Sequence, residues 1–214
     1  MTNLFANISL NKVAIFTGVG FILMLFLGIF GMPLYQNLIV PGDEATTINN
    51  IMANLLLFRL GIASYLIILI LDVVVAVGLY MIFKQVNKNL ALLQMWLRLL
   101  YTAVALISLV VLVLLFITAY NLAQLIAYTF FIPHIFVLGY LVYKSGFFPR
   151  PLGILVIIAS FCYLILTYGE FLLPQNLYEA SFLIVILIAV IGEISVGIAL
   201  LWKGLRNEIS EMKS

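Results

Sequence analysis

Four ionisable residues lie inside long apolar stretches of the sequence, where charge is unexpected. They are Asp72, Arg98, His134 and Glu193. A charged side chain at the centre of a membrane helix costs about 2.5–3.5 kcal/mol on insertion scales, so such residues usually pair with one another or serve a function. Two carboxyl groups, an imidazole and a guanidinium that met in a low-dielectric setting could bind or move a proton, a cation or a polar headgroup.

These four residues are predicted to share one layer of the membrane. Each of three apolar stretches ends in a lysine (Lys84, Lys144 or Lys203). At a rise of ~1.5 Å per residue, Asp72, His134 and Glu193 lie roughly 18, 15 and 15 Å from that lysine. Arg98 lies on the order of 12 Å into its own stretch. The same layer contains Thr102 and the candidate supporting residues Tyr101, Tyr163 and Ser195.

Three interpretations of this layer are open. In the structural one, Asp72 or Glu193 neutralises Arg98, and His134 is a neutral core histidine bonded to a tyrosine or a backbone carbonyl. In the second, the layer is a binding site. In the third, His134, Asp72 and Glu193 hold a divalent metal. No cofactor is predicted, because the chain has one histidine and no HExxH motif, whereas catalytic zinc usually takes three protein ligands.

The composition requires lipid as the main solvent. Of the 214 residues, 66% are hydrophobic and 8% are charged, and the mean hydropathy is +1.28. A soluble domain carries about 25% charged residues. A membrane-spanning helix needs ~20 apolar residues. The chain is therefore predicted to be one all-α transmembrane domain, residues 1–214, with six helices in three hairpins at about 13–32, 54–83, 90–120, 125–143, 152–173 and 181–202.

The basic residues predict the orientation of these helices. Under this assignment nearly all lysines and arginines fall on one side, namely Lys12, Lys84, Lys88, Lys144, Arg150, Lys203, Arg206 and Lys213. Cytoplasmic loops carry such an excess. We therefore expect a multi-pass protein of the cell membrane with both termini in the cytoplasm.

Other partners and chemistries find little support in the sequence. The net charge is +2 and the basic residues are scattered, so no nucleic-acid-binding patch is predicted. Cys162 is the single cysteine, which leaves no internal disulfide and no zinc-binding cysteine spacing. The expected partners are the lipid bilayer and a small-molecule or lipid ligand, and a homo-oligomer is an open alternative.

Several blocks of sequence between about Ile51 and Lys203 resemble one family. They are Phe58-Arg59-Leu60-Gly61-Ile62, Ile70-Leu71-Asp72-Val73, Asn87-Lys88-Asn89-Leu90-Ala91-Leu92-Leu93 with Trp96 and Arg98, His134, Leu138–Phe147 with Pro149-Arg150, and Ile191-Gly192-Glu193. The Lys-Ser-Gly-Phe turn at 144–147 is the most specific of them. The chain resembles the prokaryotic multi-pass membrane family catalogued as domain of unknown function 4386. The resemblance implies an integral membrane protein and assigns no activity or catalytic residue.

Three functions remain open from the sequence. The first is binding or transport of a small molecule, lipid or proton at the polar layer. The second is a metal-assisted intramembrane hydrolase or lipid-modifying enzyme, in which His134 and the carboxylates coordinate a metal. The third is a non-catalytic subunit or sensor, in which the ionisable residues are fully paired and no cavity exists. Whether the protein is an enzyme is left undecided.

Overall fold

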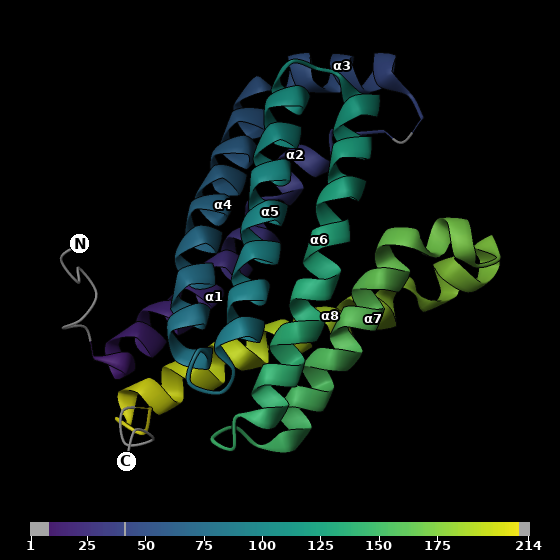
Figure 1. Ribbon diagram of the computed structural model, residues 1–214. Coiled ribbons are helices and arrows are strands. Elements are labelled where there is room, and N and C mark those ends of the chain that lie inside the picture. Colours follow the sequence, from purple (N-terminus) through teal and green to yellow (C-terminus); the bar gives the residue numbers. More distant parts are fainter. Residues whose placement is uncertain (1–8, 41, 210–214) are drawn as a thin grey trace.

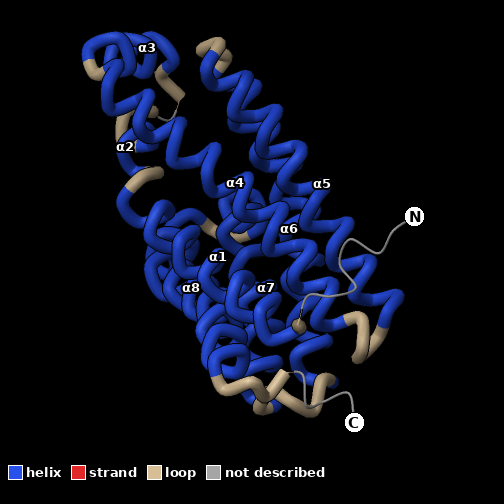
Figure 2. The backbone as a smooth tube through the Cα atoms, turned by 90° about the vertical axis from the view of Figure 1, so that its left-hand side faces the viewer, coloured by secondary structure: helices blue, strands red, loops and turns tan. Residues whose placement is uncertain are grey.

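The computed structural model describes residues 9–40 and 42–209, except for the side chains of residues 170–172. Every regular element in these ranges is a helix, and none of them contains a strand (Figure 2). The helices are α1 (Leu10–Phe30), α2 (Pro33–Gln36), α3 (Glu44–Ala53), α4 (Leu55–Phe83), α5 (Lys88–Val113), α6 (Ile117–Lys144), α7 (Arg150–Leu172) and α8 (Gln175–Leu205).

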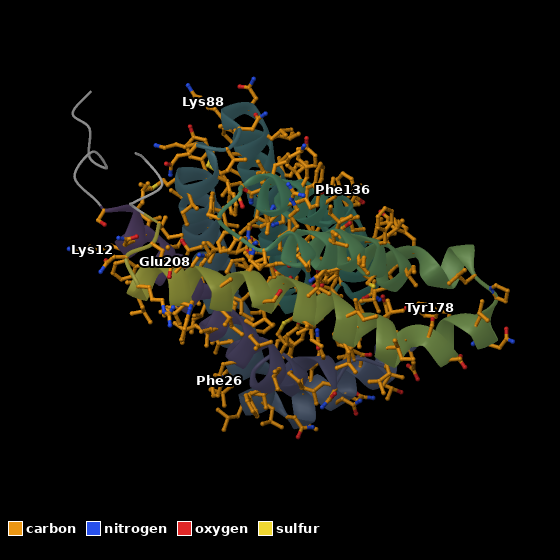
Figure 3. The ribbon with its side chains drawn as sticks, turned by 90° about the horizontal axis from the view of Figure 1, so that it is seen from below. Lys12, Phe26, Lys88, Phe136, Tyr178 and Glu208 are labelled. Carbon is orange, nitrogen blue, oxygen red and sulfur yellow. The ribbon has the colours of Figure 1, made fainter. Side chains whose placement is uncertain are left out.

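Six segments are long and apolar enough to cross a membrane. In the described ranges these are α1 with α2, followed by α4, α5, α6, α7 and α8. Large apolar side chains cover the outside of the bundle, and Phe26 and Phe136 lie on that surface (Figure 3). The expectation of an all-helical, six-span membrane protein is confirmed.

The six long helices form a closed ring. Helix α1 packs against α4 and α8, and the pairs α4–α5, α5–α6, α6–α7 and α7–α8 complete the circuit. The predicted hairpins are thus neighbours in space. The far halves of α7 and α8 lean away from the bundle formed by α4, α5 and α6 (Figure 1). The ring is therefore closed more tightly at one end than at the other.

Both ends of the described chain lie at one end of the bundle. The Asn11 amide donates to Asn207 Oδ1 at 3.1 Å, and the Ile209 N–H donates to Asn11 Oδ1 at 3.0 Å. Lys12 and Glu208 lie close together in Figure 3. The loops after α4 and α6 lie at the same end (Figure 1). We call this the basic end, because it holds Lys12, Lys84, Lys88, Lys144, Arg150 and Lys203. Lys213 lies outside the described residues.

The loop at 144–150, which carries the most specific part of the family resemblance, is a packed turn. Gly146 has a φ of +73°, a conformation that glycine adopts without strain. The Ser145 hydroxyl donates to the Val142 carbonyl at 2.6 Å, and the Phe148 N–H donates to Ser145 Oγ at 3.3 Å. The Phe148 ring is buried beside Phe83. The loop thereby fixes α4 next to the α6–α7 hairpin.

The turn between α5 and α6 lies earlier than predicted. The sequence favoured helices at 90–120 and 125–143, but α5 ends at Val113 and α6 begins at Ile117. Leu115 has a φ of +64°. Its N–H donates to Leu112 O, and the next N–H donates to Val111 O, which is the Schellman arrangement that normally ends on glycine. A leucine at this position gives no sequence signal of a turn.

Two further boundaries differ from the prediction. Residues 44–53 form a separate helix, α3, whose N-terminus is capped by Asp43, which accepts from the Thr46 N–H at 2.9 Å. Helix α8 begins at Gln175 rather than near Ser181. The Gln175 amide donates to Glu179 at 2.9 Å, so polar residues that resemble a loop form the first turn of a helix.

Candidate functional site

The structure brings Asp72, Arg98, His134 and Glu193 together around the Arg98 guanidinium. Arg98 lies on α5 and is fully buried. Its Nε and Nη2 donate to Asp72 Oδ1 on α4 at 2.8 and 2.5 Å. The Thr102 hydroxyl donates to the other Asp72 oxygen. The Asp72 carboxylate is thus bonded at both oxygens, and its side chain is 1% exposed.

His134 on α6 is a second direct partner of the guanidinium. Arg98 Nη1 lies 3.0 Å from His134 Nε2. Because arginine carries only donors, Nε2 must accept and the ring proton must lie on Nδ1. Nδ1–H then donates to the Gln94 backbone carbonyl at 3.1 Å. These contacts assign His134 as a neutral ring whose Nδ1–H is bonded to a backbone carbonyl.

Gln94 completes the surroundings of His134. Its side-chain amide lies 3.0 Å from Nδ1 and is fully buried. The atom placed there is Nε2, and the buried Oε1 has no hydrogen-bond partner. Because Nδ1 carries the proton, turning the amide by 180° puts Oε1 beside Nδ1 and gives it a donor. Gln94, Arg98 and Thr102 are four residues apart, so they line one face of α5. This polar stripe within an apolar helix is a sequence signal that would have identified Gln94.

Glu193 on α8 approaches the same guanidinium less closely. Its Oε1 lies 3.6 Å from Arg98 Nη2, and its Oε2 accepts from the Tyr163 hydroxyl on α7 at 3.0 Å. The Glu193 side chain is 17% exposed, whereas the Arg98 side chain is fully enclosed. The cluster thus contains one sealed carboxylate and one partly open carboxyl group.

A cavity of about 650 Å³ opens beside Glu193. It lies inside the helix ring, and residues from α1, α2, α4, α5, α6, α7 and α8 line it. Its walls are mainly apolar, and Asp72, Tyr101, Tyr163 and Glu193 form the polar part of the lining at the depth of the cluster. Gln36 and Asn121, both exposed, line it toward the end opposite the basic end.

The candidate supporting residues divide into two groups. Tyr101 and Tyr163 both line the cavity, and their rings flank Phe131 with centroid distances of 4.6 and 5.1 Å. Ser195 does not join them, because its hydroxyl donates to Gly192 O of its own helix at 2.8 Å. Two residues along an α-helix turn the side chain by about 200°, so Ser195 points away from the side that Glu193 occupies.

A metal is not the centre of this arrangement. The three candidate ligands His134, Asp72 and Glu193 converge on the guanidinium of Arg98, which takes the position that a cation would take. His134 Nε2, the nitrogen that faces the carboxylates, accepts from Arg98. Within the described ranges, no three His, Cys, Asp or Glu side chains are grouped as metal ligands. The three side chains that the metal-assisted enzyme would use as ligands are thus partners of Arg98 in this structure.

A second polar cluster, which the sequence did not reveal, lies toward the end opposite the basic end. The Tyr35 and Tyr120 hydroxyls are 3.3 Å apart, and the Gln124 amide donates to Tyr65 at 3.0 Å. Tyr35 and Tyr65 are buried and their rings stack. These bonds join α2 and α4 to α6. At the end opposite the basic end, these three helices are therefore held together by hydrogen bonds, whereas α7 and α8 lean away from them.

Comparison with known proteins identifies a family and assigns no activity. The family model described as "Domain of unknown function (DUF4386)" matches residues 16–118 and 110–204. An "Uncharacterized protein" of the archaeon Archaeoglobus fulgidus is 42% identical over 105 residues, which are 49% of this chain and 64% of the relative. The chain thus covers less than two thirds of that relative. No solved structure matches the chain. The family expected from the sequence blocks is confirmed.

Proposed function

The chain belongs to this prokaryotic family of unknown function, and on that premise we propose that it binds an amphipathic small molecule or lipid inside the membrane. The observation that carries the proposal is the cavity of about 650 Å³, with apolar walls and the Glu193 carboxyl group at its inner end. Ligand sites are typically about 300–1,000 Å³, apolar, and equipped with a few polar groups that orient the ligand. The apolar part of the ligand lies along α1 and α8, and its polar group contacts Glu193.

This function accounts for the cavity better than a purely structural subunit does. A structural subunit needs its ionisable residues fully paired and no internal space. Asp72 meets the first condition, since both of its oxygens are bonded. Glu193 does not, because its nearest contact with Arg98 is 3.6 Å and its side chain faces the cavity. The partly open carboxyl group therefore supports a binding role.

The ligand enters, on this proposal, from the side of the membrane opposite the basic end. The excess of lysine and arginine at the basic end supports a cytoplasmic location for both termini in the cell membrane. A cysteine placed at Asn89 or at Glu179, with Cys162 replaced by Ala, tests the orientation in intact cells. A membrane-impermeant maleimide should label the Glu179→Cys variant alone, and labelling of Asn89→Cys alone would reverse the orientation.

Photolabelling tests the binding site itself. The probe is a neutral long-chain alcohol with a diazirine in its chain, added to the purified protein in nanodiscs. We expect more label on the cavity residues Met24, Tyr128 and Ile186 than on the lipid-facing Phe26 and Phe136. Label that follows lipid exposure alone would contradict the proposal.

Gly28 offers a variant that fills the cavity without disturbing the packing. A Cβ at Gly28 would meet no atom within 4 Å, and the residue lines the cavity. Gly28→Phe should therefore reduce the label on cavity residues several-fold. Leu23→Phe adds an aromatic ring on the lipid-facing side of the same helix and should leave the label unchanged. Equal labelling in both variants would contradict a ligand in the cavity.

A further inference from the structure

The charged groups in the cavity lining are all acidic. Asp72 and Glu193 both belong to it, and none of the described residues that line it is a lysine, arginine or histidine. The Arg98 guanidinium lies behind the lining, where Phe21 covers it at 5.2 Å from the ring centroid. A ligand in the cavity therefore meets acidic groups and aromatic rings first.

The charges of the cluster do not cancel. Asp72 and Arg98 form a close pair, and His134 is neutral because its Nε2 accepts from the guanidinium. An ionised Glu193 then leaves one negative charge in excess. Its other contact is the neutral Tyr163 hydroxyl, which cannot balance a charge. An uncompensated carboxylate in an apolar setting favours an opposite charge nearby.

A group of four aromatic rings lines the same cavity as Glu193. Tyr101, Tyr128, Phe131 and Tyr163 line the cavity, and neighbouring rings among them lie 4.6–6.0 Å apart. The faces of aromatic rings attract cations, and groups of such rings are the usual recognition element for quaternary ammonium ions. The carboxyl group and the rings thus favour the same class of ligand.

We propose that the ligand of this cavity is a lipophilic cation, an organic ammonium whose charge lies between Glu193 and the aromatic rings and whose apolar substituents fill the rest of the cavity. The inference rests on the proposed function and adds the sign of the charge. Glu193 is the residue that confers this specificity, because Asp72 is already occupied by Arg98 and Thr102.

Three probes that share one diazirine-bearing alkyl chain test the inference. They end in a trimethylammonium group, a hydroxyl group or a sulfate group. In the wild-type protein the ammonium probe should label the cavity residues Met24, Tyr128 and Ile186 several-fold more than the alcohol, and the sulfate should label them least. This ranking needs no variant, so it does not depend on how a substitution folds.

Glu193→Gln tests the residue that confers the specificity. The variant should lose most of the ammonium labelling in the cavity. Labelling by the alcohol should fall much less, because glutamine keeps an oxygen that accepts a hydrogen bond, and this labelling reports that the cavity has formed. The control Glu179→Gln removes an exposed carboxylate near the start of α8 and should change neither probe.

The outcomes separate the two proposals. The cationic ligand is overturned, and the binding site remains, if the alcohol labels the wild-type cavity and the ammonium probe labels it no better. The same holds if the ammonium probe labels the cavity of Glu193→Gln as well as that of the wild type. If all three probes follow lipid exposure, the binding site is overturned together with the inference.

Discussion

Two glycines of the same helix show how different the two halves of the bundle are. At Gly18, toward the basic end of α1, an added Cβ would lie 2.6 Å from the Gly197 carbonyl oxygen of α8. At Gly28, almost three turns further along, the same atom would meet nothing within 4 Å. Helices α1 and α8 thus touch backbone to backbone in one half and enclose a cavity in the other. The Arg98 cluster lies at the boundary between the two halves.

The two carboxyl groups of the cluster follow the same division. Both line the cavity, but Asp72 is bonded at both oxygens and is 1% exposed, whereas Glu193 is 17% exposed and keeps a longer contact with the guanidinium. Asp72 and Arg98 therefore act as a structural pair that joins α4 to α5. Glu193 is the group left for a ligand.

Breaking the Asp72–Arg98 pair should have the largest effect on stability. Arg98→Met leaves the Asp72 carboxylate buried without its partner, and breaking a buried pair in this way costs about 3–5 kcal/mol. The midpoint of thermal unfolding in detergent measures the loss. The double variant Asp72→Leu/Arg98→Met should recover much of it, since no charge is left unpaired.

Glu193→Gln is the matched comparison for that pair. The contact of Glu193 with Arg98 is longer than that of Asp72, and the Glu193 side chain is partly exposed. We expect a clearly smaller loss of stability than for Arg98→Met, because Asp72 still neutralises the guanidinium and glutamine has nearly the same shape as glutamate. A loss as large as that of Arg98→Met would show that Glu193 is a structural partner of Arg98, which would contradict the division of roles.

The glycine comparison gives the next largest effect. Gly18→Leu forces bulk against the α8 backbone and should cost about 1–3 kcal/mol, the usual range for overpacking. Gly28→Leu places the same side chain in the cavity and should be neutral, or stabilising by up to about 1 kcal/mol through helix propensity. Unfolding midpoints of the two variants measure the difference. Equal losses would mean that no cavity lies beside Gly28.

A smaller effect is expected at the turn between α5 and α6. Leu115 holds a φ of +64°, which glycine adopts without the penalty that a side chain brings. Leu115→Gly should relieve about 1 kcal/mol of backbone strain. The half-buried Leu115 side chain packs against the core, so its loss offsets part of this gain and the net stabilisation should be smaller. A leucine that needed its side chain for packing would instead lose stability on this substitution, and the thermal midpoint distinguishes the two results.

The smallest effect is the pH dependence of the contact between α3 and α6. The Thr118 hydroxyl and backbone N–H both donate to Glu44, which lowers the pKa of this carboxyl below its ordinary value of 4.5. A carboxyl group with a lowered pKa contributes stability above the unfolded-state pKa and loses it as the pH falls through the folded-state value. The stability advantage over Glu44→Gln should thus be present at neutral pH and shrink below pH 4.5. A constant difference across that range would contradict it.

The sequence predicts the positions of the helices well, but it does not predict how each helix is rotated about its own axis. Apolar length and terminal lysines place six spans and put Asp72, Arg98, His134 and Glu193 at one depth, because depth follows from the constant rise of a helix. The direction of a side chain around the axis depends on packing against neighbours. For that reason Ser195 shares the depth of Glu193 and lies outside the cluster.

Other features depend on contacts that no local pattern records. The turn at Leu115 carries none of the residues that usually mark a helix end. The cavity is lined by helices from both ends of the sequence, and α7 and α8 lean away from the bundle of α4, α5 and α6 (Figure 1). Gln94 could have been predicted from its spacing to Arg98 and Thr102, and the tyrosine cluster around Tyr120 could not.

The central claim is that, of the two carboxyl groups in the cavity lining, Glu193 is accessible to a ligand and Asp72 is held by Arg98 and Thr102. Dicyclohexylcarbodiimide, an apolar reagent that couples to carboxyl groups inside membranes, tests it in one experiment when the modified residues are located by mass spectrometry. The account predicts modification of Glu193, no modification of Asp72, and loss of the Glu193 product in Gly28→Phe but not in Leu23→Phe. Modification of Asp72 to the same extent as Glu193, or of neither, would contradict it.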